Sequence, residues 1–316
     1  MKTEIEQWVD QLRAGDPRAL ARAISTVENR TAGWSELLKA LFPHSGQARI
    51  LGLTGPPGAG KSTLVDQLAH HYRKEKRTVG IIAVDPTSPY TGGAILGDRI
   101  RMQEHFSDSG IYIRSMATRG SLGGLARTTA DVATVLDASG RDLVMIETVG
   151  VGQDEVDIVR LADITIVILV PGMGDDVQTI KAGIMEIADI FVINKCDRDG
   201  AERVEREIRA LQSLAVRSDH WTPPIVKTIA SQGAGIAELA VAIRDYETYL
   251  QKQNLAVSRK VENWQNRLLE MLRDGLLERA REQLGNGALA RYAAEVAEHR
   301  RDPYSLVEEI VNSLGK

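Results

Sequence analysis

The sequence is poor in cysteine, in long apolar runs and in excess charge of either sign, and each shortage excludes a class of protein. Cys196 is the only cysteine among the 316 residues, so an internal disulfide is impossible and the paired thiols of a secreted, disulfide-stabilised domain are missing. The longest apolar run, residues 164–170, is far shorter than the ~20 residues needed to cross a bilayer. With 39 basic and 43 acidic residues, the net charge of -4 offers no electrostatic attraction for nucleic acid or an anionic membrane.

The amino-terminal residues are acidic and contain no apolar stretch of the kind found in signal peptides. We therefore expect a soluble, cytoplasmic protein that binds neither nucleic acid nor membrane. Hydrophobic residues make up 43% and charged residues 26% of the chain, which is ordinary for a globular protein. The length allows a full α/β core with one or two smaller modules.

Short apolar runs alternate with helical spacing from about residue 46 to residue 250. Several runs, such as residues 79–84 and 164–170, do not alternate polar with apolar side chains, which is typical of strands buried on both faces. The pattern predicts an α/β fold with a doubly wound, mostly parallel sheet, whose ligands bind beyond the carboxyl ends of the strands. The expected strands are residues 49–54, 78–84, 111–115, 142–147, 164–170, 190–194 and 225–229.

Residues 55–63 read G-P-P-G-A-G-K-S-T and fit the phosphate-binding pattern G-x-x-x-x-G-K-[ST] without a mismatch. An apolar run precedes the segment and helical spacing follows it over residues 62–75. In a strand-loop-helix of this kind, backbone N–H groups and the helix N-terminus surround a phosphate. Lys61 is predicted to reach the β and γ phosphates, and the Ser62 hydroxyl to bind Mg²⁺. The predicted nucleotide contacts of this loop are Gly55, Pro57, Gly58, Ala59, Gly60, Lys61, Ser62 and Thr63.

Residues 194–197 read N-K-C-D and fit the base-recognition pattern N-K-x-D, directly after the apolar run 190–193. A carboxylate at Asp197 can accept hydrogen bonds from N1–H and the exocyclic amine of guanine, while the stem of Lys195 lies along the base. Adenine has no donors in that arrangement, so the pattern favours GTP over ATP. Asn194 completes the motif, and Ala230 with Ser231 is predicted to offer a backbone contact to the guanine carbonyl.

Three carboxylates lie near the ends of the predicted strands and are candidates for the magnesium site. Mg²⁺ keeps several waters and takes one or two carboxylates together with phosphate oxygens. We assign Asp85 and Glu147 to direct or water-mediated contact, with Asp98 next in line; the alternative is that they cap helices or turns. Gly150 would let a backbone N–H approach the γ phosphate, so loss of that phosphate would release the loop that follows.

Helical spacing alone is present before residue 46 and after residue 250. Asp16 and Pro17 predict a helix start, and Asp302 with Pro303 predicts another. About 60 residues make a marginal core, so the carboxy-terminal helices need a further surface, for which we favour a second copy of the chain. The predicted division is an N-terminal helical segment (1–45), a P-loop GTPase domain (46–250) and a C-terminal helical dimerisation arm (251–316).

Three longer strings resemble the MeaB/ArgK-type GTPases of the SIMIBI class. They are E-T-V-G-V-G-Q at residues 147–153, D-P-T-S-P at residues 85–89, and T-G-G-A-I-L-G-D-R-I-R-M at residues 91–102. The resemblance implies a homodimeric GTPase that acts as a chaperone for an adenosylcobalamin-dependent acyl-CoA mutase, typically methylmalonyl-CoA mutase. In that family the GTPase gates cofactor loading and protects the mutase, with Mg²⁺ as cofactor and GTP and GDP as substrate and product.

The resemblance also implies a mobile segment at residues 171–181, from which Lys181 would approach the γ phosphate when the mutase binds. A lysine there suits the negative charge of a phosphoryl-transfer transition state, although a solvated loop is the simpler interpretation. We expect hydrolysis to be slow without the partner. The candidate catalytic residues are Lys61, Asp98, Glu147, Gln153 and Lys181.

Two other functions stay open beside the mutase chaperone. One is a kinase that phosphorylates a transport-associated protein, although the sequence shows no catalytic base for a protein hydroxyl. The other is a GTPase that delivers metal to a nickel enzyme. One cysteine and six scattered histidines make a soft-ligand cluster for that role hard to assemble.

Overall fold

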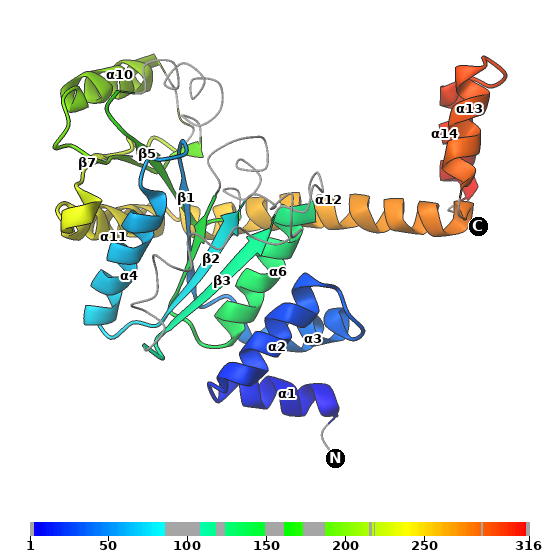
Figure 1. The fold of residues 1–316 in the computed structure, drawn as a ribbon, viewed down its shortest axis with the longest axis horizontal. Helices are drawn as coiled ribbons and strands as arrows, with labels where there is room; N and C mark the ends of the chain where they lie inside the picture. Colours follow the sequence, from blue (N-terminus) through cyan, green and yellow to red (C-terminus); the bar gives the residue numbers. More distant parts are fainter. Residues whose placement is uncertain are drawn as a thin grey trace. The chain divides into compact units, whose positions relative to one another are not determined.

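The structure is a computed structural model that describes residues 3–85, 108–117, 124–148, 161–172, 187–214, 217, 219–285 and 287–313. Contacts divide the chain into two compact units, Met1–Lys260 and Val261–Lys316. The first unit is an α/β domain preceded by helices, and the second is helical (Figure 1). The three-part division at residues 45 and 250 stays a prediction.

Seven parallel strands form the sheet of the first unit, in the order β3-β2-β4-β1-β5-β6-β7. This confirms the predicted doubly wound α/β fold, with a sheet that is entirely parallel. All seven predicted strands are present, and their ends differ from the prediction by at most two residues. The strands are β1 (Arg49–Thr54), β2 (Val79–Asp85), β3 (Ile111–Ala117), β4 (Leu143–Glu147), β5 (Ile164–Leu169), β6 (Ile190–Ile193) and β7 (Ile225–Lys227).

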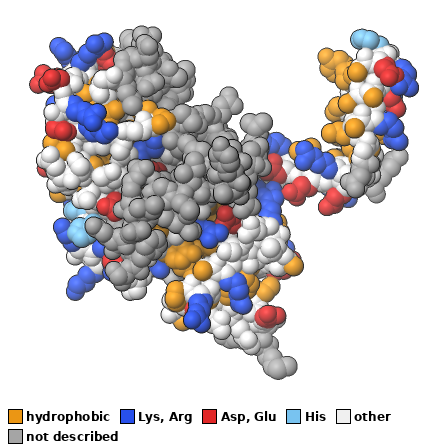
Figure 2. Space-filling view, in the orientation of Figure 1, with side chains coloured by type: hydrophobic (Ala, Val, Ile, Leu, Met, Phe, Trp, Pro, Cys, Tyr) orange, Lys and Arg blue, Asp and Glu red, His pale blue; other side chains and the backbone are white. Residues whose placement is uncertain are grey.

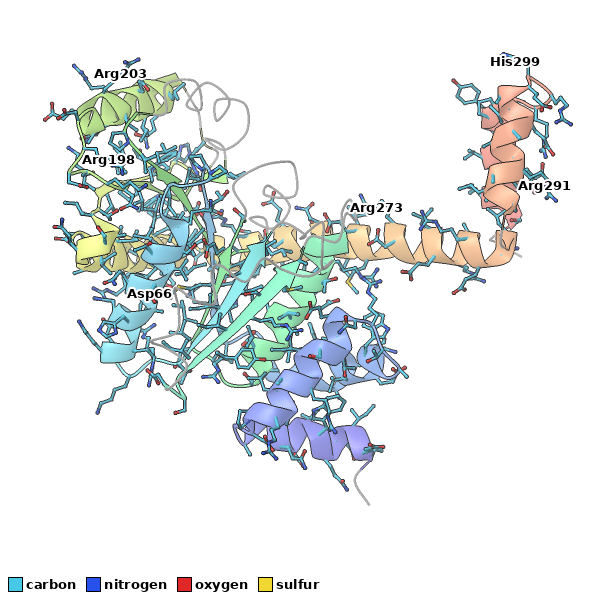
Figure 3. All side chains as sticks on the ribbon, viewed as in Figure 1. Asp66, Arg198, Arg203, Arg273, Arg291 and His299 are labelled. Atoms are coloured by element: carbon cyan, nitrogen blue, oxygen red, sulfur yellow. The ribbon has the colours of Figure 1, made fainter. Side chains whose placement is uncertain are left out.

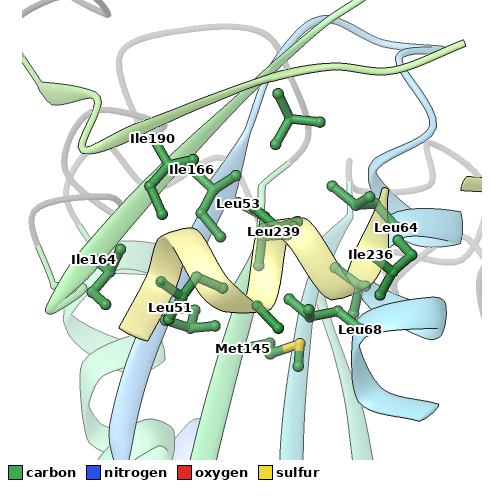
Figure 4. Packing of buried hydrophobic residues seen from close by; sticks show 14 of the residues in the cluster. Leu51, Leu53, Leu64, Leu68, Met145, Ile164, Ile166, Ile190, Ile236 and Leu239 are labelled. Atoms are coloured by element: carbon green, nitrogen blue, oxygen red, sulfur yellow. The ribbon is translucent and has the colours of Figure 1, made fainter. Parts of the chain in front are cut away.

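Helices cover both faces of the sheet because each strand carries apolar side chains on both sides. On one face, the helices α4 (Lys61–Lys74) and α11 (Ile236–Lys252) share a buried cluster with β1, β4, β5 and β6, which Figure 4 shows around Leu53, Leu68 and Leu239. On the other face, α6 (Gly124–Ala138) packs on β2 and β4, and α10 (Ala201–Leu214) packs on β5 and β6. Apolar clusters therefore cover both faces of the sheet.

Three amino-terminal helices extend the core on the α6 face. They are α1 (Glu4–Arg13), α2 (Pro17–Glu28) and α3 (Trp34–Leu41), followed by the short helix η1 (Phe42–His44). The predicted start of α2 is confirmed, because Asp16 Oδ1 accepts hydrogen bonds from the backbone N–H of Arg18 at 2.8 Å and of Ala19 at 3.2 Å. Leu20, Ile24 and other residues of these helices join the α6 cluster, so the helices pack on the central domain.

The second unit contains most of α12 (Leu255–Leu284), then α13 (Ala288–Ala297) and α14 (Pro303–Ser313). Gly285 and Gly287 lie between α12 and α13, and Asp302 Oδ1 accepts the backbone N–H of Ser305 at 2.8 Å at the predicted start of α14. No helix within the described ranges is long and apolar enough to cross a membrane.

Tyr72 gives the first unit a defined sensitivity to alkaline pH. Its side chain is buried on α4, and burial, with a smaller contribution from Glu247, raises the pKa of the Tyr72 phenol to about 12. The unfolded chain loses this proton near pH 10, before the folded protein does. The contribution of Tyr72 to the free energy of unfolding is therefore fully present below about pH 10. It falls, by up to roughly 2–3 kcal/mol, as the pH rises toward 12.

Chemical denaturation at two pH values, one below pH 10 and one between 10 and 12, measures this loss. Between these two pH values, we expect the free energy of unfolding to fall less for Tyr72→Phe than for the unaltered chain. Tyr304→Phe, which removes an exposed phenol, is the control. Equal losses in the Tyr72→Phe variant and the unaltered chain would contradict the prediction.

Candidate functional site: a nucleotide site at the carboxyl edge of the sheet

The phosphate-loop segment connects β1 to α4, as predicted. Gly55 has φ of +147°, and a Cβ atom there would lie 2.1 Å from the backbone oxygen of Ile168 on β5, so only glycine fits. Gly60 forms the N-cap of α4 at φ +87°, where it has no side chain to cover the first N–H groups of the helix. These N–H groups and the positive end of the helix dipole lie where the pattern predicts a phosphate.

Lys61 holds its ammonium group over this loop. Its Nζ donates hydrogen bonds to the carbonyl oxygens of Gly55 at 2.8 Å and Pro56 at 3.2 Å, and the side chain is buried. A buried cation beside a helix N-terminus is a strong attractor for a polyphosphate. The loop is thus built for an anion, and its lysine is already positioned by backbone oxygens.

Ser62 and Glu147 meet beneath the loop from two different elements. The Ser62 hydroxyl, in the first turn of α4, donates a 2.7 Å hydrogen bond to Glu147 Oε1 at the end of β4. Both side chains are buried. Beside them, Thr148 Oγ1 donates to Thr54 Oγ1 at 3.0 Å, which joins the ends of β1 and β4. A hydroxyl and a carboxylate that converge at a phosphate loop are oxygen ligands of the type Mg²⁺ prefers.

The base-recognition motif follows β6 and is hydrogen-bonded to the phosphate loop. Asn194 donates through Nδ2 to the Ala59 oxygen at 2.8 Å, and Lys195 donates through Nζ to the Gly58 oxygen at 2.7 Å. Lys195 also has φ of +56°, a conformation that a non-glycine residue adopts at a cost and that is frequent at functional sites. The two motifs therefore form one continuous site.

Asn194 also binds the segment after β7, so it connects three loops. Its Oδ1 accepts hydrogen bonds from Thr228 Oγ1 and from the backbone N–H of Ala230, both at 3.0 Å. Ala230 and Ser231 belong to the short helix η3 (Ala230–Gln232). With the amide engaged on both sides and the residue buried, Asn194 acts in this structure as a brace within the site. Asp197 is exposed beside it.

Cys196 lies in the middle of the motif and is half-buried. Burial raises the pKa of the Cys196 thiol above its ordinary value, and the thiol donates to the Ile193 oxygen at 2.9 Å. The protonated thiol is therefore favoured here, which suits a packing role better than a reactive one.

Several predicted site residues fall outside the described residues: Asp98, Gly150, Gln153 and Lys181. Asp85 is the last residue of β2, where the prediction had placed it just after the strand, and only its backbone is described. Among the described residues, no group of three or more His, Cys, Asp or Glu side chains could hold a metal ion. Of the predicted magnesium ligands, the side chains that the structure describes are those of Ser62 and Glu147.

Sequence reasoning did not assign a role to the buried threonines Thr54, Thr148 and Thr228. Each directly follows or ends an apolar strand run, and each hydroxyl is used in a hydrogen bond between loops. A threonine at the carboxyl end of a buried strand was the available signal. It was too common a pattern to interpret without the neighbouring strand in view.

The parallel sheet, the phosphate loop after its central strand and the base motif two strands away define a P-loop nucleotide-binding domain of the GTPase class. Comparison with known proteins is consistent with that class and narrows it. The family model "Methylmalonyl Co-A mutase-associated GTPase MeaB" matches residues 20–284. The chain belongs to this family of GTPases.

Individual relatives agree with the family assignment. A protein of Pyrococcus abyssi named as a GTPase is 46% identical over 313 residues, which cover 98% of this chain and 97% of the relative. The mouse methylmalonic aciduria type A homolog, a mitochondrial protein, is 36% identical over 281 residues, covering 82% of this chain and 68% of the relative. A crystal structure of an LAO/AO transport system kinase superposes with a TM-score of 0.74 at 27% identity, and the match covers 100% of both chains.

Proposed function

We propose that this chain binds GTP with Mg²⁺ and regulates cofactor loading and protection of an adenosylcobalamin-dependent acyl-CoA mutase through its GTPase cycle. One observation carries the choice of partner: the mutase-associated family model matches residues 20–284, nearly the whole first unit and part of the second. The name of the mouse relative, which refers to methylmalonic aciduria, supports the same partner class. The site described above supports the nucleotide.

In this proposal the phosphates lie along the loop from Gly55 to Thr63. The Lys61 ammonium group contacts the β and γ phosphates. It either leaves its two carbonyl partners or keeps hydrogen bonds to them while its remaining N–H donors reach the phosphates. Guanine lies against Lys195, with Asp197 accepting its two N–H donors and the Ala230 to Ser231 backbone facing its carbonyl. The fixed hydrogen bonds of Asn194 keep the base and phosphate subsites at one separation, so binding does not have to order them.

The residues present fit a magnesium ion. Ser62 Oγ and Glu147 Oε1 are 2.7 Å apart and buried at the phosphate loop, and exchange of this hydrogen bond for two metal contacts keeps both groups satisfied. When bound, Mg²⁺ supplies charge neutralisation for the phosphate oxygens. Asp85 and Asp98 are proposed to complete the shell directly or through water.

The catalytic and switching residues of the proposal are Gly150, Gln153 and Lys181. Gly150 follows Thr148 by two residues in the sequence, and Thr148 Oγ1 donates a hydrogen bond to Thr54, the residue directly before the phosphate loop. Lys181 would stabilise charge on the γ phosphate in the presence of the partner, and Gln153 would orient the attacking water. Hydrolysis without the partner is proposed to be slow.

The second unit is proposed to bind a second copy of the chain. Among the described residues of this unit, the buried apolar side chains are those of Ala288 and Leu306. On α12, by contrast, the side chains of Leu269 and Leu272 are 65% and 58% exposed. Figure 2 shows more hydrophobic side chains on the surface of α13 and α14. Apolar surface on this scale, in a unit with a small core of its own, favours a self-association role.

The test is complex formation with a cobalamin-dependent acyl-CoA mutase, followed by light scattering and phosphate release. We expect a complex whose formation depends on the nucleotide, GTP turnover at least ~10-fold faster in the complex, and a free protein of twice the 34.6 kDa chain mass. The partner proposal is contradicted if no such mutase forms a complex. A free monomer would contradict the dimer alone.

The kinase alternative is kept because of the structural match to the LAO/AO transport system kinase. The same experiment separates it from the chaperone proposal. Transfer of the γ phosphate from labelled GTP to a protein, with no release of inorganic phosphate, would favour the kinase.

A further inference from the structure

A second polar cluster lies at the opposite end of β6 from the base motif, around Asp189. The residue is fully buried, and its Oδ1 accepts hydrogen bonds from Tyr246 Oη at 2.7 Å, Arg217 Nη2 at 3.1 Å and Arg259 Nη1 at 3.2 Å. Its Oδ2 accepts the backbone N–H of Thr165 at 2.9 Å. Four donor residues from four segments therefore meet at one carboxylate.

The surroundings of this cluster are closely packed. Trp221 Nε1 donates to the Asp189 backbone oxygen at 2.8 Å, and the Trp221 ring lies 4.9 Å from that of Tyr246. Arg217 also binds Asp219 at 2.7 Å. Burial raises the pKa of Asp189, while the charges of Arg259 and Arg217 act in the opposite direction. A buried carboxylate of this kind tolerates poorly the loss of any one donor.

Two of the elements that meet at Asp189 adjoin, at their other ends, the segments with the predicted guanine contacts. β6 runs only from Ile190 to Ile193, so Asp189 immediately precedes the strand and Asn194 immediately follows it. α11, which carries Tyr246, begins at Ile236, a few residues after Ala230 and Ser231. A four-residue strand spans roughly 13 Å and is hydrogen-bonded on both sides, so its two ends move together.

The third element is α12, which carries Arg259 in its second turn. Arg259 belongs to the first unit, yet the same helix continues without a break into the second. Besides its bonds to Asp189, the Arg259 guanidinium lies 5.4 Å from the centre of the Tyr246 ring. The beginning of α12 is thus fixed to the same carboxylate that supports both base-contacting segments.

We propose that Asp189, Tyr246 and Arg259 form a positioning cluster that couples the first turns of α12 to guanine nucleotide affinity. Fixing Arg259 on Asp189 holds β6 and α11 where Lys195, Asp197 and the Ala230 backbone can bind the base. Displacement of Arg259, for example when a protein binds the helix that bears it, loosens both segments and lowers the affinity for GDP. Linkage requires the converse, so bound nucleotide stabilises the first turns of α12. The inference rests on the proposed guanine site.

The first test measures GDP affinity of the full-length protein with a fluorescent GDP analogue. Arg259→Ala and Tyr246→Phe are each expected to weaken GDP binding about 5-fold or more, and Arg259→Lys to restore part of the loss. The control is Arg203→Ala, which removes an exposed arginine that pairs with Glu207 on α10. Figure 3 labels Arg203 on this helix. Thermal unfolding confirms that each protein is folded at the temperature of the titration.

A role limited to stability would lower the unfolding temperature and leave GDP affinity of the folded protein unchanged. GDP affinities within about twofold of the unaltered chain for both variants would therefore overturn the inference. If both variants fail to fold, amide hydrogen exchange of the unaltered protein, measured with and without GDP, tests the coupling instead. Exchange of residues 255–260 is expected to be slower with GDP than without it, and equal exchange would overturn the coupling. Failure of the unaltered chain to bind GDP at all would instead contradict the proposed function, and the coupling with it.

Discussion

Replacement of Lys61 by alanine is expected to lower GTP hydrolysis at least about 100-fold. The ammonium group is buried at the phosphate loop, where it would stabilise charge that grows on the phosphates in the transition state. Its two described hydrogen bonds are to carbonyl oxygens of the loop itself, Gly55 and Pro56, so the variant should keep the fold. Steady-state phosphate release and thermal unfolding measure the two effects.

The control for this experiment is Lys74→Ala, which removes an exposed lysine from the last turn of the same helix. Hydrolysis by that variant should match the unaltered chain. A Lys61→Ala protein that is folded and hydrolyses GTP at the normal rate would show that the phosphate loop does not hold the reacting phosphates.

Asp197→Asn is expected to weaken GDP binding by about 10²- to 10⁴-fold. Two hydrogen bonds to a charged carboxylate, each worth roughly 1.5–3 kcal/mol, are lost or replaced by a repulsive pairing of amide and amine donors. Because Asp197 is exposed, its replacement leaves the buried bonds of Asn194 in place. Calorimetric titration of GDP into the variant and the unaltered chain measures the loss.

The same substitution should improve the binding of a xanthine nucleotide. Xanthine has a carbonyl where guanine has its exocyclic amine, so an asparagine can donate to that oxygen and accept from N1–H. Asp199→Asn, two residues further along the exposed loop, is the control and should leave both affinities unchanged. Unchanged GDP affinity in Asp197→Asn would place base recognition elsewhere.

The sheet could be predicted from the sequence because its signal is local. Runs such as Ile164–Leu169, apolar except for Thr165, do not alternate polar with apolar side chains, which is typical of strands buried on both faces, and each such run formed a strand. Strand ends were less certain: β3 extends to Ala117 and β7 stops at Lys227, each two residues from the predicted end. Both are edge strands, which pair with a single neighbour that the sequence does not display.

The phosphate loop and base motif could also be located from sequence, because their chemistry requires fixed residues at fixed spacing. The motif did not reveal the hydrogen-bond partners of each side chain. Asn194 is predicted as part of the nucleotide-binding motif, and the structure adds that its amide binds Ala59, Thr228 and Ala230. The roles of the site residues in nucleotide binding stay predictions.

The Asp189 cluster could not have been inferred from the sequence. Its arginine partners, Arg217 and Arg259, lie 28 and 70 residues further along the chain, with no motif or spacing to connect them. Only the return of α12 and of the segment between α10 and β7 to the start of β6 brings the charges together. Long-range ion pairs of this kind follow from the tertiary fold and have no local signature.

Titration of GDP and of ADP, each with Mg²⁺, into the unaltered chain tests the central claim most directly, because the claim is that one site combines a phosphate loop with guanine recognition. The account predicts one GDP per chain and an affinity for ADP at least about 100-fold weaker. Equal affinities for the two nucleotides, or binding of neither, would contradict it.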